Sequence, residues 1–241
     1  MDILTPDRQF TAYGLSHWVV LVVFAVVALL LVRVGRGHAD AAEARRFSRT
    51  FAVVILVLYL AIWLYSLVPP SLDRSMPLHL SDLASLVSAY ALWTHRHWAF
   101  SLTYFWCLTL SVQALLSPVL TGPDFPHIGF LAFWGIHLLV IWAAIYLTWG
   151  LRLRPDWRSY RIAVAATVTW AVVTFTFNSF AGTNYGFLNR KPDTPSLLDV
   201  LGPWPWYLLP VAALVLGAWA LMTWPWTRSA KHRVTGSPPT R

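Results

Sequence analysis

Four side chains in the sequence could together perform acid–base or acyl chemistry: His79, Ser81, Asp82 and His137. His79 and Asp82 are three residues apart, so on a helix they share a face and the carboxylate can orient the imidazole. An oriented histidine can act as a general base for a nearby hydroxyl nucleophile. These four are the candidate catalytic residues. The alternatives are a buried pair that locks packing for His79 and Asp82, and a packing histidine bonded to a backbone carbonyl for His137.

Several other polar residues lie in or beside apolar stretches. Because an unpaired polar side chain costs free energy in hydrocarbon, polar residues at such positions are candidates for a functional role. They are the candidate pocket or substrate-binding residues: His17, Gln113, Asn178, Asn184, Tyr185, Asn189 and Arg190. The last four belong to a connection rich in Gly, Pro, amide and aromatic residues that could cap a cavity. Arg190 could meet a phosphate or carboxylate headgroup there. A connector at the membrane interface without a ligand is the alternative.

Metal and cofactor chemistry have little support in the sequence. Cys107 is the only cysteine, and there is no HExxH motif or glycine-rich nucleotide loop. A zinc site built from His79, Asp82 and His137 is conceivable, but no ligand spacing supports it. We therefore expect no metal and no cofactor, and we expect Cys107 to be a buried small residue rather than a nucleophile.

The elements that must position these residues are seven apolar stretches. A helix rises about 1.5 Å per residue, so about 20 residues cross a hydrocarbon core of about 30 Å. We predict spans at about residues 17–35, 50–68, 77–94, 98–117, 128–149, 159–180 and 204–224. The expected fold is all-α: a bundle of seven transmembrane helices in one domain, residues 1–227, followed by a basic, disordered cytoplasmic tail, residues 228–241.

The distribution of positive charge predicts the orientation of the bundle. All but four of the 18 Lys and Arg residues lie in the tail or in alternate connections between the predicted spans. Because short basic loops resist translocation, we expect the tail and these connections to be cytoplasmic. The chain is therefore expected to start outside and end inside. On this topology the candidate residues lie in the outer half, with His79 about 3 Å, Asp82 about 7 Å and His137 about 13 Å deep.

The net charge of +8 would suggest nucleic acid binding in a soluble protein. Here the basic residues lie beside predicted membrane edges, so we expect anionic headgroups at the cytoplasmic face to be their partners, and no nucleic acid. We expect membrane phospholipid as the partner of the outer polar residues. The oligomeric state is left open.

Several motifs resemble the YwaF-like family of bacterial integral membrane proteins. They are residues 77–82 (PLHLSD), 104–106 (YFW), 113–118 (QALLSP), His137, 182–192 (GTNYGFLNRKP) and 201–206 (LGPWPW). That family is in turn distantly similar to the transmembrane protein 164 family, which includes an acyltransferase that remodels ether phospholipids through a cysteine acyl intermediate. The resemblance implies a multi-pass protein of the bacterial plasma membrane.

The resemblance carries over only in part. The cysteine of the animal protein falls on Leu78, which cannot be acylated, and bacterial relatives often have a cysteine at the position of Ser81. The two histidines, His79 and His137, match. The predicted function is a lipid acyltransferase or hydrolase of the outer leaflet, with His79 or His137 as base and Ser81 as nucleophile. The alternatives are a non-catalytic solute-binding or proton-coupled transport protein and a structural envelope component.

Overall fold

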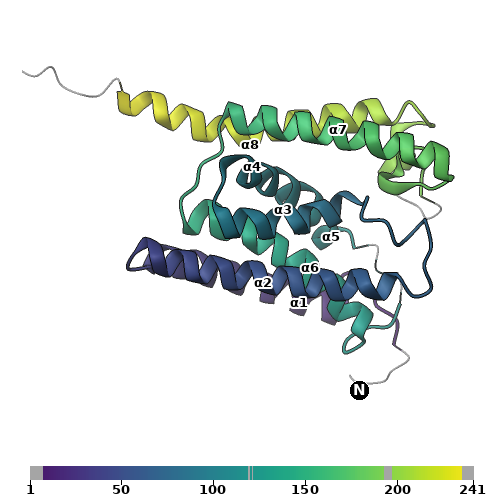
Figure 1. Cartoon of the computed structure of the whole chain (residues 1–241), viewed down its shortest axis with the longest axis horizontal. Coiled ribbons are helices and arrows are strands. Elements are labelled where there is room, and N and C mark those ends of the chain that lie inside the picture. Colours follow the sequence, from purple (N-terminus) through teal and green to yellow (C-terminus); the bar gives the residue numbers. More distant parts are fainter. Residues whose placement is uncertain (1–7, 119, 121, 193–196, 235–241) are drawn as a thin grey trace, which may run out of the picture. The chain divides into compact units, whose positions relative to one another are not determined.

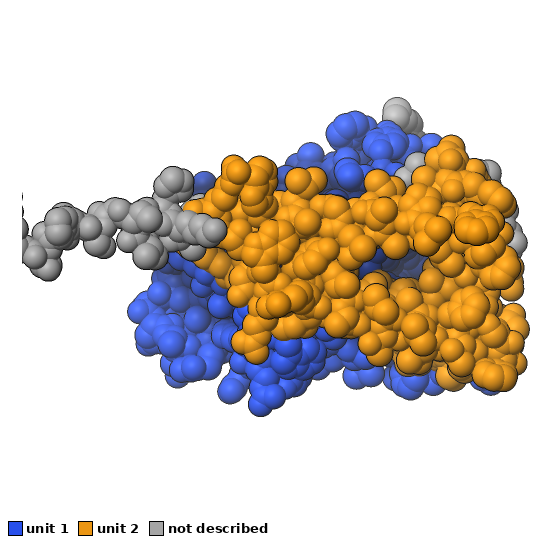
Figure 2. Space-filling view, turned by 90° about the horizontal axis from the view of Figure 1, so that it is seen from above, with its two compact units in different colours: residues 1–70, 81–153 blue, residues 71–80, 154–241 orange. Residues whose placement is uncertain are grey.

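A computed structural model describes residues 8–118, 120, 122–192 and 197–234, and these residues form helices and no strand. The prediction of an all-α fold is confirmed. The chain divides into two compact units, residues 1–70 with 81–153 and residues 71–80 with 154–241 (Figure 2). The single domain over residues 1–227 stays a prediction.

The first unit contains the helices labelled α1 to α6 in Figure 1. Their bounds are α1 Leu15–Gly37, α2 Ala41–Ser66, α3 Leu80–Thr94, α4 His97–Trp106, α5 Val112–Leu116 and α6 Ile128–Ile145. A π-helical turn, η1 (Cys107–Ser111), joins α4 to α5, and a second, η2 (Tyr146–Gly150), extends α6. All of α3 except its first residue belongs to this unit.

Helix α2 begins nine residues before the predicted span at residue 50. Its N-cap is Asp40, whose carboxylate accepts hydrogen bonds from the backbone N–H groups of Ala42 and Glu43. Capping satisfies amide groups that a helix start would otherwise leave unpaired, so the charged segment in front of the apolar stretch is helical too.

The interior of the first unit is aromatic and aliphatic. One buried cluster contains Val20, Leu115, Phe130, Trp134, Leu138 and Ile141. At the other end of α1 the backbone itself comes into contact with η2. A Cβ atom on Gly35 would lie 2.6 Å from the Cα atom of Gly150, so this crossing requires glycine.

The second unit contains α7 (Trp157–Ala181) and α8 (Leu208–Val234), which pack against each other, and the short helices η3 (Tyr185–Phe187) and η4 (Leu197–Leu201) (Figure 1). Asp156 caps the start of α7 by accepting from the N–H of Ser159. Gly182 ends α7 in the left-handed conformation, φ 70°, that glycine adopts without strain.

Six helices of the described chain are long and apolar enough to cross a membrane: Leu15–Gly37, Ala41–Ser66, His97–Leu116, Ile128–Gly150, Trp157–Ala181 and Leu208–Arg228. Each coincides with a predicted span. The seventh, predicted at 77–94, corresponds to α3, which starts at Leu80 and has 15 residues, about 22 Å of helix. The count of seven spans and the orientation therefore stay predictions.

The segment predicted as a tail, residues 228–241, starts as helix, because α8 continues to Val234. Residues 235–241 lie outside the described residues.

Candidate functional site

Asn178, in the last turn of α7, organises the chain that follows the helix. Its side-chain oxygen accepts hydrogen bonds from the Thr183 hydroxyl (2.7 Å) and from the backbone N–H of Tyr185 (2.9 Å), and its amide nitrogen donates to the Tyr185 carbonyl (3.0 Å). Asn178, Thr183 and Tyr185 are all buried. Because Gly182 turns the chain back on itself, one buried amide satisfies three groups and fixes the position of Tyr185.

Tyr185 in turn holds the segment that leads to the candidate histidine. Its hydroxyl donates to the Leu72 carbonyl (2.5 Å) and accepts from the N–H of Met76 (3.2 Å). Its ring meets the imidazole of His79 edge to face, with 4.8 Å between centroids. His79 itself is exposed. Two predicted pocket residues, Asn178 and Tyr185, thus lie together with the predicted catalytic His79.

A second anchor acts one residue before His79. The indole N–H of Trp170, on α7, donates to the carbonyl of Leu78 at 2.9 Å. Leu78 is the position that the resemblance matched to an acylated cysteine. Its side chain offers no nucleophile, but its backbone helps to fix the approach to His79.

The other predicted residues of the connection form a loop closed by asparagine side chains. The Asn184 oxygen accepts from the N–H groups of Asn189 (3.2 Å) and Arg190 (3.1 Å), and its nitrogen donates to the Arg190 carbonyl (2.9 Å). The Asn189 amide donates to the Ser179 hydroxyl, while its oxygen is buried with no hydrogen-bond partner among the described residues. The Arg190 side chain, by contrast, is exposed.

Ser81 and Asp82 lie in the first turn of α3, in the first unit. Ser81 is exposed and Asp82 is half-buried, within electrostatic range of Tyr59 on α2. Ser81 follows His79 by two residues, so the chain itself keeps their Cα atoms within about 7 Å. The hydrogen bond between His79 and Asp82 stays a prediction.

His137 lies on α6 and is partly buried. Its Nδ1 is 2.7 Å from the carbonyl oxygen of Phe133, one turn earlier on the same helix. Since a carbonyl only accepts, Nδ1 carries the hydrogen and Nε2 is left as the basic nitrogen of the neutral ring. This is the backbone-bonded arrangement considered as the alternative, and it is equally compatible with a base.

Two predicted pocket residues of the first unit differ sharply in burial. His17 is fully buried, accepts from the N–H of Tyr13 (2.9 Å), lies 2.9 Å from the Leu115 carbonyl and stacks on Trp134. Both its ring nitrogens are therefore engaged in packing α1 against its neighbours. Gln113, on α5, is exposed. Their role in a pocket stays a prediction.

Cys107 is fully buried, and its sulfur lies 3.2 Å from the Ser88 hydroxyl. This environment agrees with the expectation of a buried small residue. Among the described residues there is no group of three or more His, Cys, Asp or Glu placed to hold a metal ion.

The sequence analysis missed a polar chain in the first unit that joins α2 and η2 to the residues following α1 and α3. The hydroxyl of Tyr146 lies 3.0 Å from Nε2 of His38 and 3.3 Å from the Ser48 hydroxyl, which in turn lies 3.0 Å from Nε2 of His95. Burial, aided by the charges of Arg45 and Arg49, lowers the pKa of His95. The search for function considered polar residues inside apolar stretches, and both histidines lie in connections outside them.

Comparison with known proteins supports a membrane assignment. The family model of the TMEM164 family matches residues 12–223. No curated protein and no solved structure matches the chain. The six apolar helices are those of a multi-pass membrane protein and are compatible with association with membrane lipid. Since the match covers most of the sequence, the chain belongs to the TMEM164 family.

Proposed function

We propose that this protein is a membrane enzyme that transfers or hydrolyses lipid acyl groups, with His79 as general base and Ser81 as nucleophile. The observation that carries the proposal is the placement of an exposed imidazole on a buried scaffold. Asn178 fixes Tyr185, and Tyr185 holds both the ring of His79 and the segment before it. A scaffold of this kind reduces the motion of the base itself, and the chain keeps Ser81 two residues away.

The reaction follows from these groups. His79 accepts the proton of the Ser81 hydroxyl as the oxygen attacks the carbonyl carbon of a lipid ester. The bond from that carbon to the lipid alcohol then breaks, and the alcohol leaves with the proton from His79. The acyl group on Ser81 passes by the reverse steps to a second lipid hydroxyl or to water.

The start of α3 supports the charge that develops during this reaction. The first N–H groups of a helix have no partner within it, so those around Ser81 can donate to the oxyanion. Asp82, one residue later, is proposed to orient His79. His137 is the alternative base, through its Nε2.

The substrate is proposed to be a membrane phospholipid, bound from the extracytoplasmic side of a bacterial plasma membrane. Arg190 is exposed and can pair with its phosphate, and it lies in one loop with Asn189. Asn184 holds both in one loop. His17 and Gln113, in the first unit, stay predicted pocket residues, and the basic cytoplasmic connections are proposed to meet anionic headgroups.

Labelling with a fluorophosphonate probe tests the nucleophile. Purified protein in lipid nanodiscs should be labelled, and Ser81→Ala should abolish both labelling and the release of acyl groups from a fluorescent phospholipid. Ser117→Ala, which alters another exposed serine, is the matched control and should leave both unchanged. Labelling that persists in Ser81→Ala would eliminate Ser81 as the nucleophile.

A flux assay separates the enzyme from a transporter. Proteoliposomes with an imposed pH gradient should show no proton uptake above that of empty vesicles. Uptake that is lost in Asp82→Asn, without any acyl release by the wild-type protein, would overturn the enzymatic proposal in favour of proton-coupled transport.

A further inference from the structure

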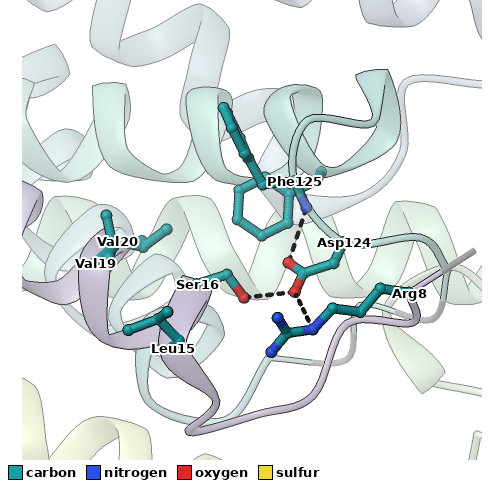
Figure 3. A pocket seen from close by; sticks show the side chains of 8 residues that line it. Arg8, Leu15, Ser16, Val19, Val20, Asp124 and Phe125 are labelled. Carbon is teal, nitrogen blue, oxygen red and sulfur yellow. Dashed lines mark hydrogen bonds and ion pairs between the residues drawn. The ribbon is translucent and has the colours of Figure 1, made fainter. Parts of the chain in front are cut away.

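A pocket of about 280 Å³ opens at the start of α1, in the first unit, and involves none of the candidate catalytic residues (Figure 3). Its lining combines an apolar wall with a charged pair, Arg8 and Asp124. The sequence analysis did not single out either residue, because they are separated by more than a hundred positions and lie outside the apolar stretches.

The charged end of the pocket is built rigidly. The carboxylate of Asp124 accepts from the Ser16 hydroxyl (2.8 Å) and the N–H of Phe125 (2.8 Å), and lies 3.5 Å from Nε of Arg8 (Figure 3). The backbones are joined as well, since the N–H of Asp124 donates to the Arg8 carbonyl at 2.7 Å. Asp124 is therefore fixed in place, and it holds Arg8 at the pocket.

The two partners of this pair differ in exposure. The side chain of Asp124 is 5% exposed, whereas that of Arg8 is 40% exposed. Only Nε of the guanidinium faces the carboxylate, and Figure 3 shows the two terminal nitrogens directed towards the start of α1. These nitrogens form a planar pair of donors suited to a carboxylate or phosphate anion.

The wall of the pocket continues into an exposed apolar side of α1, a helix that is long and apolar enough to cross a membrane. Leu15 and Val19 line the pocket and are 51% and 52% exposed, and the same side of α1 continues through the exposed Val22 and Val26. An acyl chain longer than the pocket can therefore run on along α1. A soluble anion would gain nothing from this wall, and a peptide would leave its amides unpaired against it.

We infer that this pocket binds a membrane phospholipid, with the phosphate on the terminal nitrogens of Arg8 and one acyl chain against Leu15, Val19 and Phe125. The oxygens of the phosphodiester complement the terminal N–H donors of Arg8, and the apolar wall complements the chain. The site is an accessory lipid site, and its occupancy does not depend on catalytic turnover.

Photocrosslinking tests this inference on the full-length protein in phosphatidylcholine nanodiscs. The probe is phosphatidylglycerol with a diazirine in one acyl chain, and labelled peptides are identified by mass spectrometry. We expect labelling at the start of α1 in the wild type. Arg8→Gln, which removes a charge-assisted contact, and Val19→Trp, which fills the pocket, should each lower it about tenfold.

The control is Val54→Trp, which places the same bulk on α2, outside the lining of the pocket, at a residue of similar exposure, 47%. Its labelling should equal that of the wild type. Arg8→Gln leaves the bonds of Asp124 to Ser16 and Phe125 in place, so it retains the fold and decides the test even if Val19→Trp is unstable.

Three results would overturn the inference. One is equal labelling in all four proteins, which indicates lipid of the surrounding bilayer only. Another is the absence of labelling at the start of α1. The third is labelling by a diazirine fatty acid that is as strong as that by the phospholipid and insensitive to Arg8→Gln, which indicates an acyl slot that does not recognise a phosphate. Because no arm measures acyl release, a failure of the proposed enzymatic function would leave these results unaffected.

Discussion

Tyr146 in the first unit and Tyr185 in the second are both fully buried, and each is the centre of a hydrogen-bond network. The Tyr146 hydroxyl connects His38 to the buried Ser48, and Ser48 reaches His95, so this network ends on two partly buried histidines. The Tyr185 network ends on His79, which is exposed. The two networks therefore differ in the exposure of the side chain on which they end, and this difference is why we place the proposed site at the Tyr185 network.

The most severe way to break the Tyr185 network is Asn178→Ala. It would leave the Thr183 hydroxyl and the N–H and carbonyl of Tyr185 buried without their partner. At about 1 to 3 kcal/mol for each unpaired group, we expect the free energy of unfolding to fall by about 4 kcal/mol. Unfolding in detergent measures it, with Thr176→Ala as control, because this exposed hydroxyl of the same helix donates to the Val172 carbonyl and takes no part in the turn. A loss below about 1 kcal/mol would show that the amide does not organise the turn.

A smaller disturbance comes from Gly186→Ala. The new Cβ would lie 2.5 Å from a ring carbon of Trp170, the residue that holds the Leu78 carbonyl, and φ is +68°. Strain and displacement of the indole should together cost about 2 to 3 kcal/mol and reduce acyl release. Gly182→Ala is the matched control, because φ is +70° there but nothing lies within 4 Å of the new atom. Equal losses in the two variants would assign the effect to the backbone alone.

Removal of one hydroxyl from each network tests the comparison directly. Tyr146→Phe should lower the free energy of unfolding by about 1 to 2 kcal/mol and leave turnover by the remaining folded protein unchanged. Tyr185→Phe frees the segment with Leu72 and Met76, so it should lower kcat for acyl release about tenfold at a similar cost in stability. If both variants affected kcat equally, the distinction between the two networks would fail.

The smallest expected effect is the pH dependence of the Tyr146 network. Burial, together with Arg45 and Arg49, holds the pKa of His95 below its ordinary value of 6.5. The folded state therefore binds this proton more weakly than the unfolded chain, so stability is fully present above pH 6.5 and falls as the pH decreases towards the folded-state pKa. Melting temperatures measured from about pH 8 down to about pH 5 should fall along this slope. His95→Gln should flatten it. An unchanged slope in the variant would place the titration elsewhere.

The fold was largely predictable because apolar stretches of about 20 residues dominate the sequence, and all six candidate spans were found in this way. The start of α2 was not, because its first residues are charged and hydropathy assigns them to a loop. The Asp40 cap, which extends the helix over them, is a local signal that a capping analysis could have found.

The candidate site was predictable in its members and not in its contacts. Asn178, Tyr185 and His79 could be selected because each is polar beside an apolar stretch. The bonds between them depend on the turn at Gly182 and on an approach between segments more than a hundred residues apart, as in the contact of Tyr185 with Leu72. Hydropathy and spacing within one helix carry no information on such pairings, which is also why Arg8 and Asp124 escaped notice.

The crossing of α1 with η2 restricts how this sequence can change. A Cβ atom on Gly35 would come within 2.6 Å of the Gly150 backbone, and one on Gly150 would lie 3.3 Å from the Cα atom of Gly35. Gly35 cannot acquire a side chain while the Gly150 backbone stays where it is, whereas a Cβ atom on Gly150 requires its neighbours to shift by only a few tenths of an ångström. Because the two backbones are in contact, substitutions at the two positions should be non-additive in a double-mutant cycle.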